Sequence, residues 1–120
     1  MASMLFVATH ATDNPFKAIT PFEMAAAAAE SGHEVSIVLL GDAVFLLKEE
    51  IAEGLKCLGA APFNQALKTT AALEIPIFAC GTCMKARGVT DEDLRRSGAS
   101  PMNKGVFVEL VAESDNVVTF

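Results

Sequence analysis

The alternation of short apolar runs with longer helical segments is the feature that most constrains the fold of this chain. Apolar runs that are candidates for strands lie at residues 4–9, 34–40 and 76–79. The second run, EVSIVLL, is apolar at nearly every position, which is typical of a strand covered on both faces. Strands that alternate with helices in short units predict a parallel sheet with helices on both faces. We therefore expect an α/β fold.

Capping residues and helix-ending glycines delimit the helices. The first helix begins either at Asn14-Pro15 or at Thr20-Pro21, where Glu23 could complete a capping box, and it stops at Gly32. Thr90 caps a later helix with three acidic residues in its first turn. Further helical segments are predicted at 43–51, 64–73, 82–87 and 103–113, with a short link or strand at 98–102 and a last strand at 116–120.

Length and composition predict a single domain spanning residues 1–120. Hydrophobic residues make up 52% of the chain and charged residues only 20%, which does not fit a disordered protein. This apolar excess predicts a subunit interface. The net charge of −6 and the lack of a Lys/Arg-rich run disfavour binding to nucleic acid or to an anionic membrane.

No segment predicts membrane insertion or export. The run Ala25–Ala29 lies between Glu23 and Glu30, so the uninterrupted apolar stretch is far too short to span a bilayer. Residues 1–10 carry no basic segment ahead of their apolar residues, so they do not resemble a signal peptide. We therefore expect a cytoplasmic protein.

Cys80 is the residue best placed for chemistry. It follows the run at 76–79, and sites in open parallel sheets form at the carboxyl ends of strands. The next residues open a helical turn, so backbone N–H groups and the cations Lys85 and Arg87 would stabilise a thiolate. A lowered thiol pKa is the resulting hypothesis. The alternative is an inert buried cysteine, which is the interpretation we favour for Cys57.

Cys80 and Cys83 form a CxxC motif, and the chain has three cysteines in all. An odd count without an export signal argues against a structural disulfide framework. The spacing could close a redox disulfide, although the motif lies later in the chain than in thioredoxin-like proteins. Zinc needs about four ligands and no second pair at metal spacing is present, so we expect no metal. No nucleotide-binding motif occurs, and no cofactor is expected.

Residues near the same predicted sheet edge are candidates for binding: His10, Gly81, Lys85 and Arg87. His10 could orient a substrate or carry a proton, and a surface histidine without such a role is the alternative. His33 precedes the second strand at the opposite edge and is interpreted as structural. Asp42 is interpreted as the cap of the helix that it begins.

The sequence CGTCMKARG at residues 80–88 resembles the signature of the DsrE/DsrF-like family of small sulfur-relay proteins. In that family a cysteine at a strand end is followed by Arg-Gly and a hydrophobic residue, here Arg87, Gly88 and Val89. The segments GHEV at 32–35, TDED at 90–93 and DNVVTF at 115–120 are also similar to the family pattern. The resemblance therefore extends over nearly the whole chain.

The resemblance implies a three-layer sandwich with a mostly parallel, flavodoxin-like sheet of about five strands, assembled as trimers or hexamers. It also implies that Cys80 carries a persulfide, taken from a sulfur-donor protein and passed to an acceptor protein. Cys83 lies outside the minimal family pattern. It could resolve the persulfide as a disulfide, or it could be a spectator.

Three functions of different classes remain open at this point. The first is a sulfur carrier or sulfurtransferase that uses Cys80. The second is a CxxC thiol–disulfide or peroxide-reducing protein that uses Cys80 and Cys83. The third is a non-catalytic oligomeric binding module in which both cysteines are structural.

Overall fold

A five-stranded sheet, parallel throughout, forms the centre of the computed structural model, which describes residues 1–120. Its strand order is β4-β3-β2-β1-β5. The strands are β1 (Ser3–Ala8), β2 (Glu34–Leu39), β3 (Ile77–Cys80), β4 (Ser100–Met102) and β5 (Asn116–Thr119). The predicted three-layer α/β fold is confirmed. Its likeness to flavodoxin lies in the layers and the parallel strands, because flavodoxin itself has the strand order 2-1-3-4-5.

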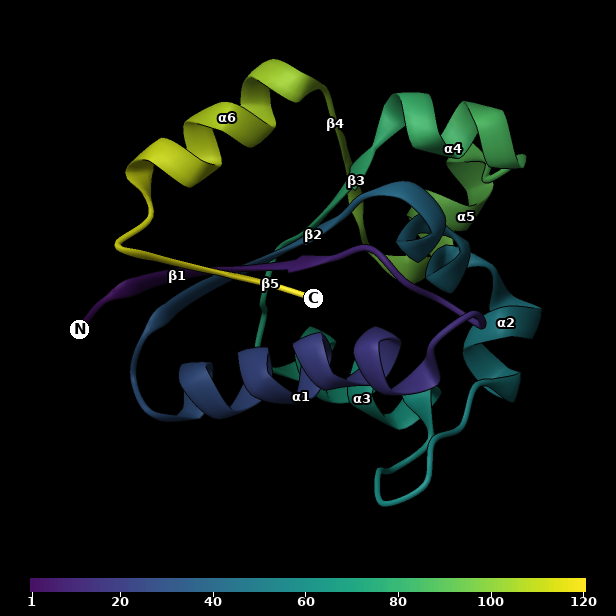
Figure 1. Ribbon diagram of the computed structural model, residues 1–120, viewed down its shortest axis with the longest axis horizontal. Coiled ribbons are helices and arrows are strands. Elements are labelled where there is room, and N and C mark those ends of the chain that lie inside the picture. The colour runs from purple at the N-terminus through teal and green to yellow at the C-terminus, as the bar shows by residue number, and fades with distance from the viewer.

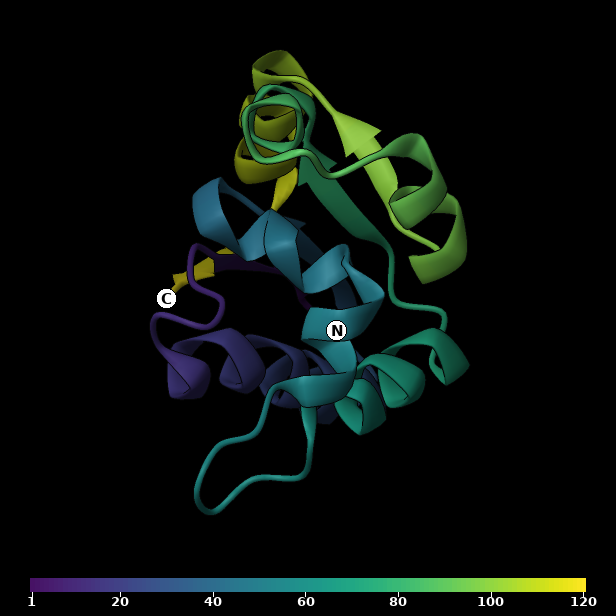
Figure 2. The ribbon, with the colours of Figure 1, turned by 90° about the vertical axis from the view of Figure 1, so that its right-hand side faces the viewer.

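Helices cover both faces of the sheet, but unequally. Figure 1 shows α1 (Pro15–Glu30) and α3 (Phe63–Ala72) on one side and α6 (Lys104–Glu113) on the other. The shorter helices gather toward the edge where β1, β2 and β3 end, which faces the viewer in Figure 2. They are the 3₁₀ helix η1 (Gly41–Leu47), α2 (Glu49–Gly54), α4 (Gly81–Arg87) and α5 (Asp91–Ser97).

The order of the strands explains the unequal cover. From β1 to β4 each new strand is added on the same side of the last, so right-handed crossovers place the connecting helices on one face. The connection from β4 to β5 runs back to the far side of β1, and the same handedness therefore places α6 on the opposite face. A single helix covers that second face, and none of its residues is buried.

The two faces of the sheet carry separate apolar clusters. The larger one includes Phe6, Ile37 and Ala79, with Phe22 of α1 and Phe63 of α3, whose rings meet edge to face at 4.9 Å between centroids. The smaller one lies under α6, with Phe107 and Leu110 packed against it. Its buried members are Leu5, Val7, Val38, Cys80 and Met102. Cys80 therefore points to the thinly covered face.

Most of the predicted elements are present. The structure also shows which of the two possible starts of the first helix is used. It begins at Pro15, because the Asn14 side chain accepts a hydrogen bond from the Lys17 N–H at 3.2 Å. Thr20 and Pro21 are buried inside this helix and do not start it. Residues 100–102 form a strand rather than a link. Every helix is too short or too polar to span a bilayer.

The prediction of one helix at 43–51 is wrong in detail. The segment is split into η1 and α2 by Lys48, whose backbone is extended with φ −81° and ψ 130°. The break lets the Lys48 ammonium reach the Asp93 carboxylate at 3.1 Å. Asp42 lies in the first turn of η1 and does not cap it, because Leu40 holds the cap position without a side-chain hydrogen bond.

Asp93 ties the start of α5 to η1 and α2. Its carboxylate accepts hydrogen bonds from the Thr90 N–H at 2.9 Å and from Lys48, and its own N–H donates to the Thr90 hydroxyl. Burial alone would raise the pKa of this carboxyl, but these hydrogen bonds and one from Arg96 lower it to about 2. The ionised form is therefore favoured by folding.

We expect Asp93→Asn to lower the free energy of unfolding by about 1–2 kcal/mol at pH 7, measured by urea unfolding. The pKa of Asp93 is lower in the folded than in the unfolded chain, so its contribution is complete above about pH 4 and is lost as the pH falls toward 2. The difference between the two proteins should shrink over that range. Asp91→Asn, at an exposed position in the same helical turn, is the control, and equal effects of the two variants would contradict this account.

Candidate functional site

Cys80 is the last residue of β3 and the cap residue of α4. Its strand lies between β2 and β4, and Cys80 is paired with Met102 of β4. Only 5% of its surface is exposed. The chain turns directly from strand to helix at this point, so the first backbone N–H groups of α4 face the Cys80 sulfur.

Cys83 lies in the first turn of α4, next to Cys80. The three cysteines of the chain are free thiols, and Cys83 is half-buried. Its sulfur accepts a hydrogen bond from the Gly41 N–H at 3.3 Å. Gly41 has φ +55°, the left-handed conformation that favours glycine, and this turn directs its N–H toward α4. The loop after β2 thus fixes the position of the second thiol.

The two thiols have opposite pKa shifts. Burial raises the pKa of Cys80, but hydrogen bonds from the Cys83 thiol and from the N–H groups of Cys83 and Thr82 outweigh it, with Lys104 adding its charge, so the pKa of Cys80 is lowered. Burial and the neighbouring Cys80 sulfur raise the pKa of Cys83. Cys80 is therefore the thiol of the pair that ionises more readily, and Cys83 is the hydrogen-bond donor to its thiolate form. The predicted lowering of the Cys80 pKa is supported.

The cation that acts on Cys80 is not one that the sequence indicated. Lys85 lies exposed on α4. Arg87 donates from Nε to Asp42 Oδ1 at 2.9 Å and from Nη1 to the Cys83 carbonyl at 3.2 Å, and its charge acts on the Cys83 thiol. Lys104, at the start of α6, supplies the charge near Cys80. Arg87 therefore holds α4 against η1 instead of stabilising the Cys80 thiolate.

A cavity of about 410 Å³ opens beside the two thiols on the α6 side of the sheet. This volume lies in the range of small-molecule sites. Apart from Cys80 and Cys83, its lining comes from Leu40 just after β2, from the end of β4 and from α6 with its cap residue, and it is mostly apolar. The lining residues are Leu40, Met102, Asn103, Lys104, Phe107 and Val108. Cys80 thus lies in the wall of a mostly apolar pocket.

The other candidate residues do not line this cavity. Gly81 is next to the lining residue Cys80 in the sequence but is not itself part of the lining. His10 is hydrogen bonded to Asp13, with Nδ1 and Oδ2 2.6 Å apart, and does not line the cavity. His33 accepts the Ala2 N–H at 3.1 Å, a structural role at the amino edge. Cys57 is half-buried in a loop and packs against the larger apolar cluster. No three side chains of the metal-ligating types gather anywhere in the chain.

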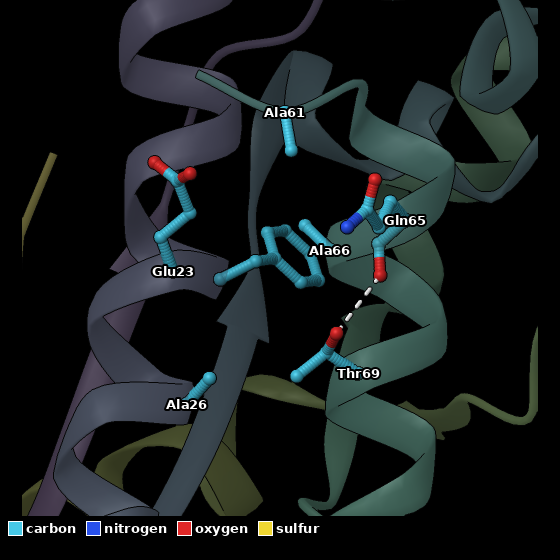
Figure 3. Close-up of a pocket in the computed structure, with 7 residues that line it drawn as sticks. Glu23, Ala26, Ala61, Gln65, Ala66 and Thr69 are labelled. Atoms are coloured by element: carbon cyan, nitrogen blue, oxygen red, sulfur yellow. Dashed lines mark hydrogen bonds between the residues drawn. The ribbon is translucent and has the colours of Figure 1, made fainter. Parts of the chain in front are cut away.

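A second pocket, of about 210 Å³, lies between α1 and α3 on the other face of the sheet (Figure 3). Glu23 and Gln65 reach its rim, and the Thr69 hydroxyl donates to the Gln65 carbonyl at 3.1 Å. Its floor is Phe22 and alanine side chains. It holds no thiol and no activated polar group, so the cavity beside Cys80 is the stronger candidate site.

Lys104 and the apolar lining are the site residues that sequence reasoning missed. The signal that could have found them is the rule that neighbouring parallel strands end at one edge. Met102 ends the strand beside Cys80, and Lys104 follows it by two residues. That Lys104 lies near Cys80 can be inferred from the sequence only once the pairing of β3 with β4 is known.

Two archaeal relatives match most of the chain. The uncharacterized protein MJ0989 of Methanocaldococcus jannaschii is 34% identical over 112 residues, which are 91% of this chain and 94% of the relative. The uncharacterized protein MK0008 of Methanopyrus kandleri is 35% identical over 109 residues, 87% of this chain and 82% of the relative. Neither name assigns an activity.

Solved structures match the fold over its full length. The ychN protein of E. coli superposes with a TM-score of 0.79 and 23% identity, covering 100% of both chains. The protein of unknown function BT1422 of Bacteroides thetaiotaomicron superposes with a TM-score of 0.72 and 14% identity, covering 99% of this chain and 95% of its own. The family model described as the DsrE/DsrF-like family matches residues 2–120, and this chain therefore belongs to the DsrE/DsrF-like family.

Proposed function

We propose that the protein carries sulfur as a persulfide on Cys80, as a sulfurtransferase or sulfur carrier of a cytoplasmic relay. The observation that supports this most directly is the pairing of two thiols with opposite pKa shifts in the wall of one cavity. The thiolate is the form that attacks sulfur, and it is favoured at Cys80 alone. Membership of a sulfur-relay-type family agrees with this chemistry.

The transfer needs only substitution at sulfur. The Cys80 thiolate attacks the outer sulfur of a donor persulfide R–S–SH, a new S–S bond forms, and the old one breaks with its electron pair leaving on the donor thiolate. An acceptor thiolate then attacks the outer sulfur in the same way and releases Cys80. A cysteine of lowered pKa is a good leaving group in this second step.

A second candidate, a thiol–disulfide or persulfide-reducing activity, is favoured by the contact between the two thiols. Cys83 could attack the inner sulfur of a Cys80 persulfide, forming the Cys80–Cys83 disulfide and releasing hydrogen sulfide. This step needs the Cys83 thiolate, and the pKa of Cys83 is raised. The raised pKa lowers the fraction of Cys83 that is ionised and able to attack, which favours the carrier over the reductase.

We also propose that the chain assembles as a homo-oligomer, a trimer or hexamer, through the face that α6 covers. No residue of α6 is buried, whereas the opposite face is closed by α1 and α3. Val106 and Val111 of α6 and Val117 of β5 each have more than a third of their surface exposed. A second copy is the occupant best suited to cover these side chains, because exposed valines that gather on α6 and β5 of a chain rich in apolar residues favour self-association.

The rate of Cys80 alkylation by iodoacetamide should reach half its maximum below pH 9.0, the ordinary thiol value. Because the lowered pKa raises the thiolate fraction at lower pH, the curve shifts to lower pH. In Cys83→Ala the midpoint should rise, since the thiol donor to Cys80 is gone. Cys57→Ser is the control and should leave the curve unchanged. A midpoint for Cys80 at or above 9.0 would contradict the assignment.

Incubation with polysulfide should add about 32 Da, one sulfur atom, to the intact protein. The adduct should be absent in Cys80→Ser and retained in Cys83→Ser, with Cys57→Ser as control. A loss of about 2 Da that requires both Cys80 and Cys83 would support the redox activity instead. No mass change in any variant would support a non-catalytic binding module.

Sedimentation equilibrium should give the wild type a mass of three or six chains. The double variant Val106→Glu/Val117→Glu should shift it toward the single chain, because two carboxylates on the apolar face disfavour its burial. Met24→Glu, at an exposed apolar position of α1 on the other face, should leave the mass unchanged. A wild type that sediments as a single chain would overturn the proposal.

A further inference from the structure

Cys80 is reached through the cavity rather than from the protein surface. Only 5% of the residue is exposed, and it lies in the cavity wall beside Cys83. A persulfide on the convex surface of a folded protein could not approach this sulfur without inserting a slender group into the cavity. Access therefore restricts the molecule that brings sulfur to Cys80.

The cavity wall has one charge and a predominantly apolar surface. Leu40, Met102, Phe107 and Val108 provide the apolar lining. The Asn103 carbonyl oxygen is occupied as the cap of α6, where it accepts the Val106 N–H at 2.8 Å. Lys104 is the charged lining residue, and it takes part in none of the ion pairs of the molecule.

Such a wall discriminates between kinds of sulfur donor. A small, highly charged inorganic donor such as thiosulfate would lose its hydration without gaining matching polar partners. A donor with an apolar body would place that body against Phe107 and Val108, while one negative charge would pair with Lys104. The cavity therefore fits a monoanion with an apolar group and disfavours a small dianion.

We propose, resting on the proposed sulfur-carrier function, that the cavity bounded by Leu40, Met102, Lys104, Phe107 and Val108 binds a small organic sulfane donor with an apolar alkyl or aryl body and one negative charge. Organic persulfides and thiosulfonates belong to this class. Lys104 is the specificity residue for the charge, and the side chains of Phe107 and Val108 select the apolar body.

The reaction with a thiosulfonate balances without any added oxidant or reductant. The Cys80 thiolate attacks the terminal sulfur of R–SO₂–S⁻, and the S–S bond of the donor breaks with its electron pair leaving on the sulfinate R–SO₂⁻. Cys80 is left as the persulfide anion. Donors that differ only in R therefore test the cavity while keeping the chemistry constant.

The experiment compares p-toluenethiosulfonate with methanethiosulfonate, both as anions, on the assembled wild-type protein. The second-order rate of Cys80 persulfide formation is followed by intact mass, and each rate is divided by that of the same donor with N-acetylcysteine. The normalised rate should be about tenfold or more higher for the aryl donor. Normalised rates that are equal, or higher for the methyl donor, would overturn the inference.

Variants of α6 separate the two features of the cavity. Val108→Asn, at a position 63% exposed, should reduce the aryl preference, whereas Met24→Asn, at an exposed apolar position of α1 on the other face of the sheet, should not. Lys104→Met should slow both anionic donors more than neutral iodoacetamide, whose rate reports the thiolate fraction. Equal effects of Val108→Asn and Met24→Asn would also overturn the inference.

The failures of the two proposals are distinguishable. If a persulfide forms on Cys80 without preference between the donors, the proposed sulfur-carrier function stands and the proposed selectivity of the cavity is wrong. If no persulfide forms on Cys80 with either donor or with polysulfide, the proposed sulfur-carrier function itself is wrong.

Discussion

The rest of the structure depends on the side of the sheet to which each strand is added. Strands β2, β3 and β4 are added on one side of β1, whereas β5 is added on the other side of β1. Four strands added in one direction place their connecting helices on a single face of the sheet, and only the return to β1 places a helix on the other. That face must be covered by α6 alone. The apolar side chains on that face of the sheet therefore border a cavity, at a place where a second helix could have packed.

Cys80 lies on this thinly covered face because side chains alternate between the two faces along a strand. Ala79 points into the larger core and Cys80, its neighbour, points the other way. One residue earlier in β3, the sulfur would point into the larger cluster under α1 and α3. The same position also ends the strand, so the N–H groups of α4 are available to a thiolate. The position of Cys80 at the end of β3 thus determines how thinly its sulfur is covered, from which side the sulfur can be reached, and which N–H groups stabilise its thiolate.

Sequence patterns predicted the elements well and the connections between them less well. The strands at 34–40 and 76–79 and the caps at Asn14 and Thr90 depend on local residues, which the chain displays directly. The split at Lys48 goes with an ion pair to Asp93, which lies 45 residues away, and no local signal marks it.

The candidate site shows the same division. Cys80 and Cys83 were found because they are close together in the sequence and chemically distinctive. Lys104 was missed and Arg87 was given the wrong partner, because charges act through space. Asp42 pairs with Arg87, and this contact joins η1 and α4, two helices that follow different strands. Only the register of β2, β3 and β4 places these side chains relative to one another.

The place of β5 in the chain has a consequence for how the thiol is exposed during folding. β5 is the last strand in the sequence, yet it pairs with β1, and the Asp115 carboxylate accepts the Ser3 N–H across 112 positions. Contacts of such long sequence separation form slowly. Strands β1 to β4 can join in order as the chain emerges, but α6 can settle on the sheet only when its connection to β5 is in place. We therefore expect Cys80 to stay open to solvent and to oxidants until α6 packs over it, which makes this thiol the most vulnerable group of a newly made chain.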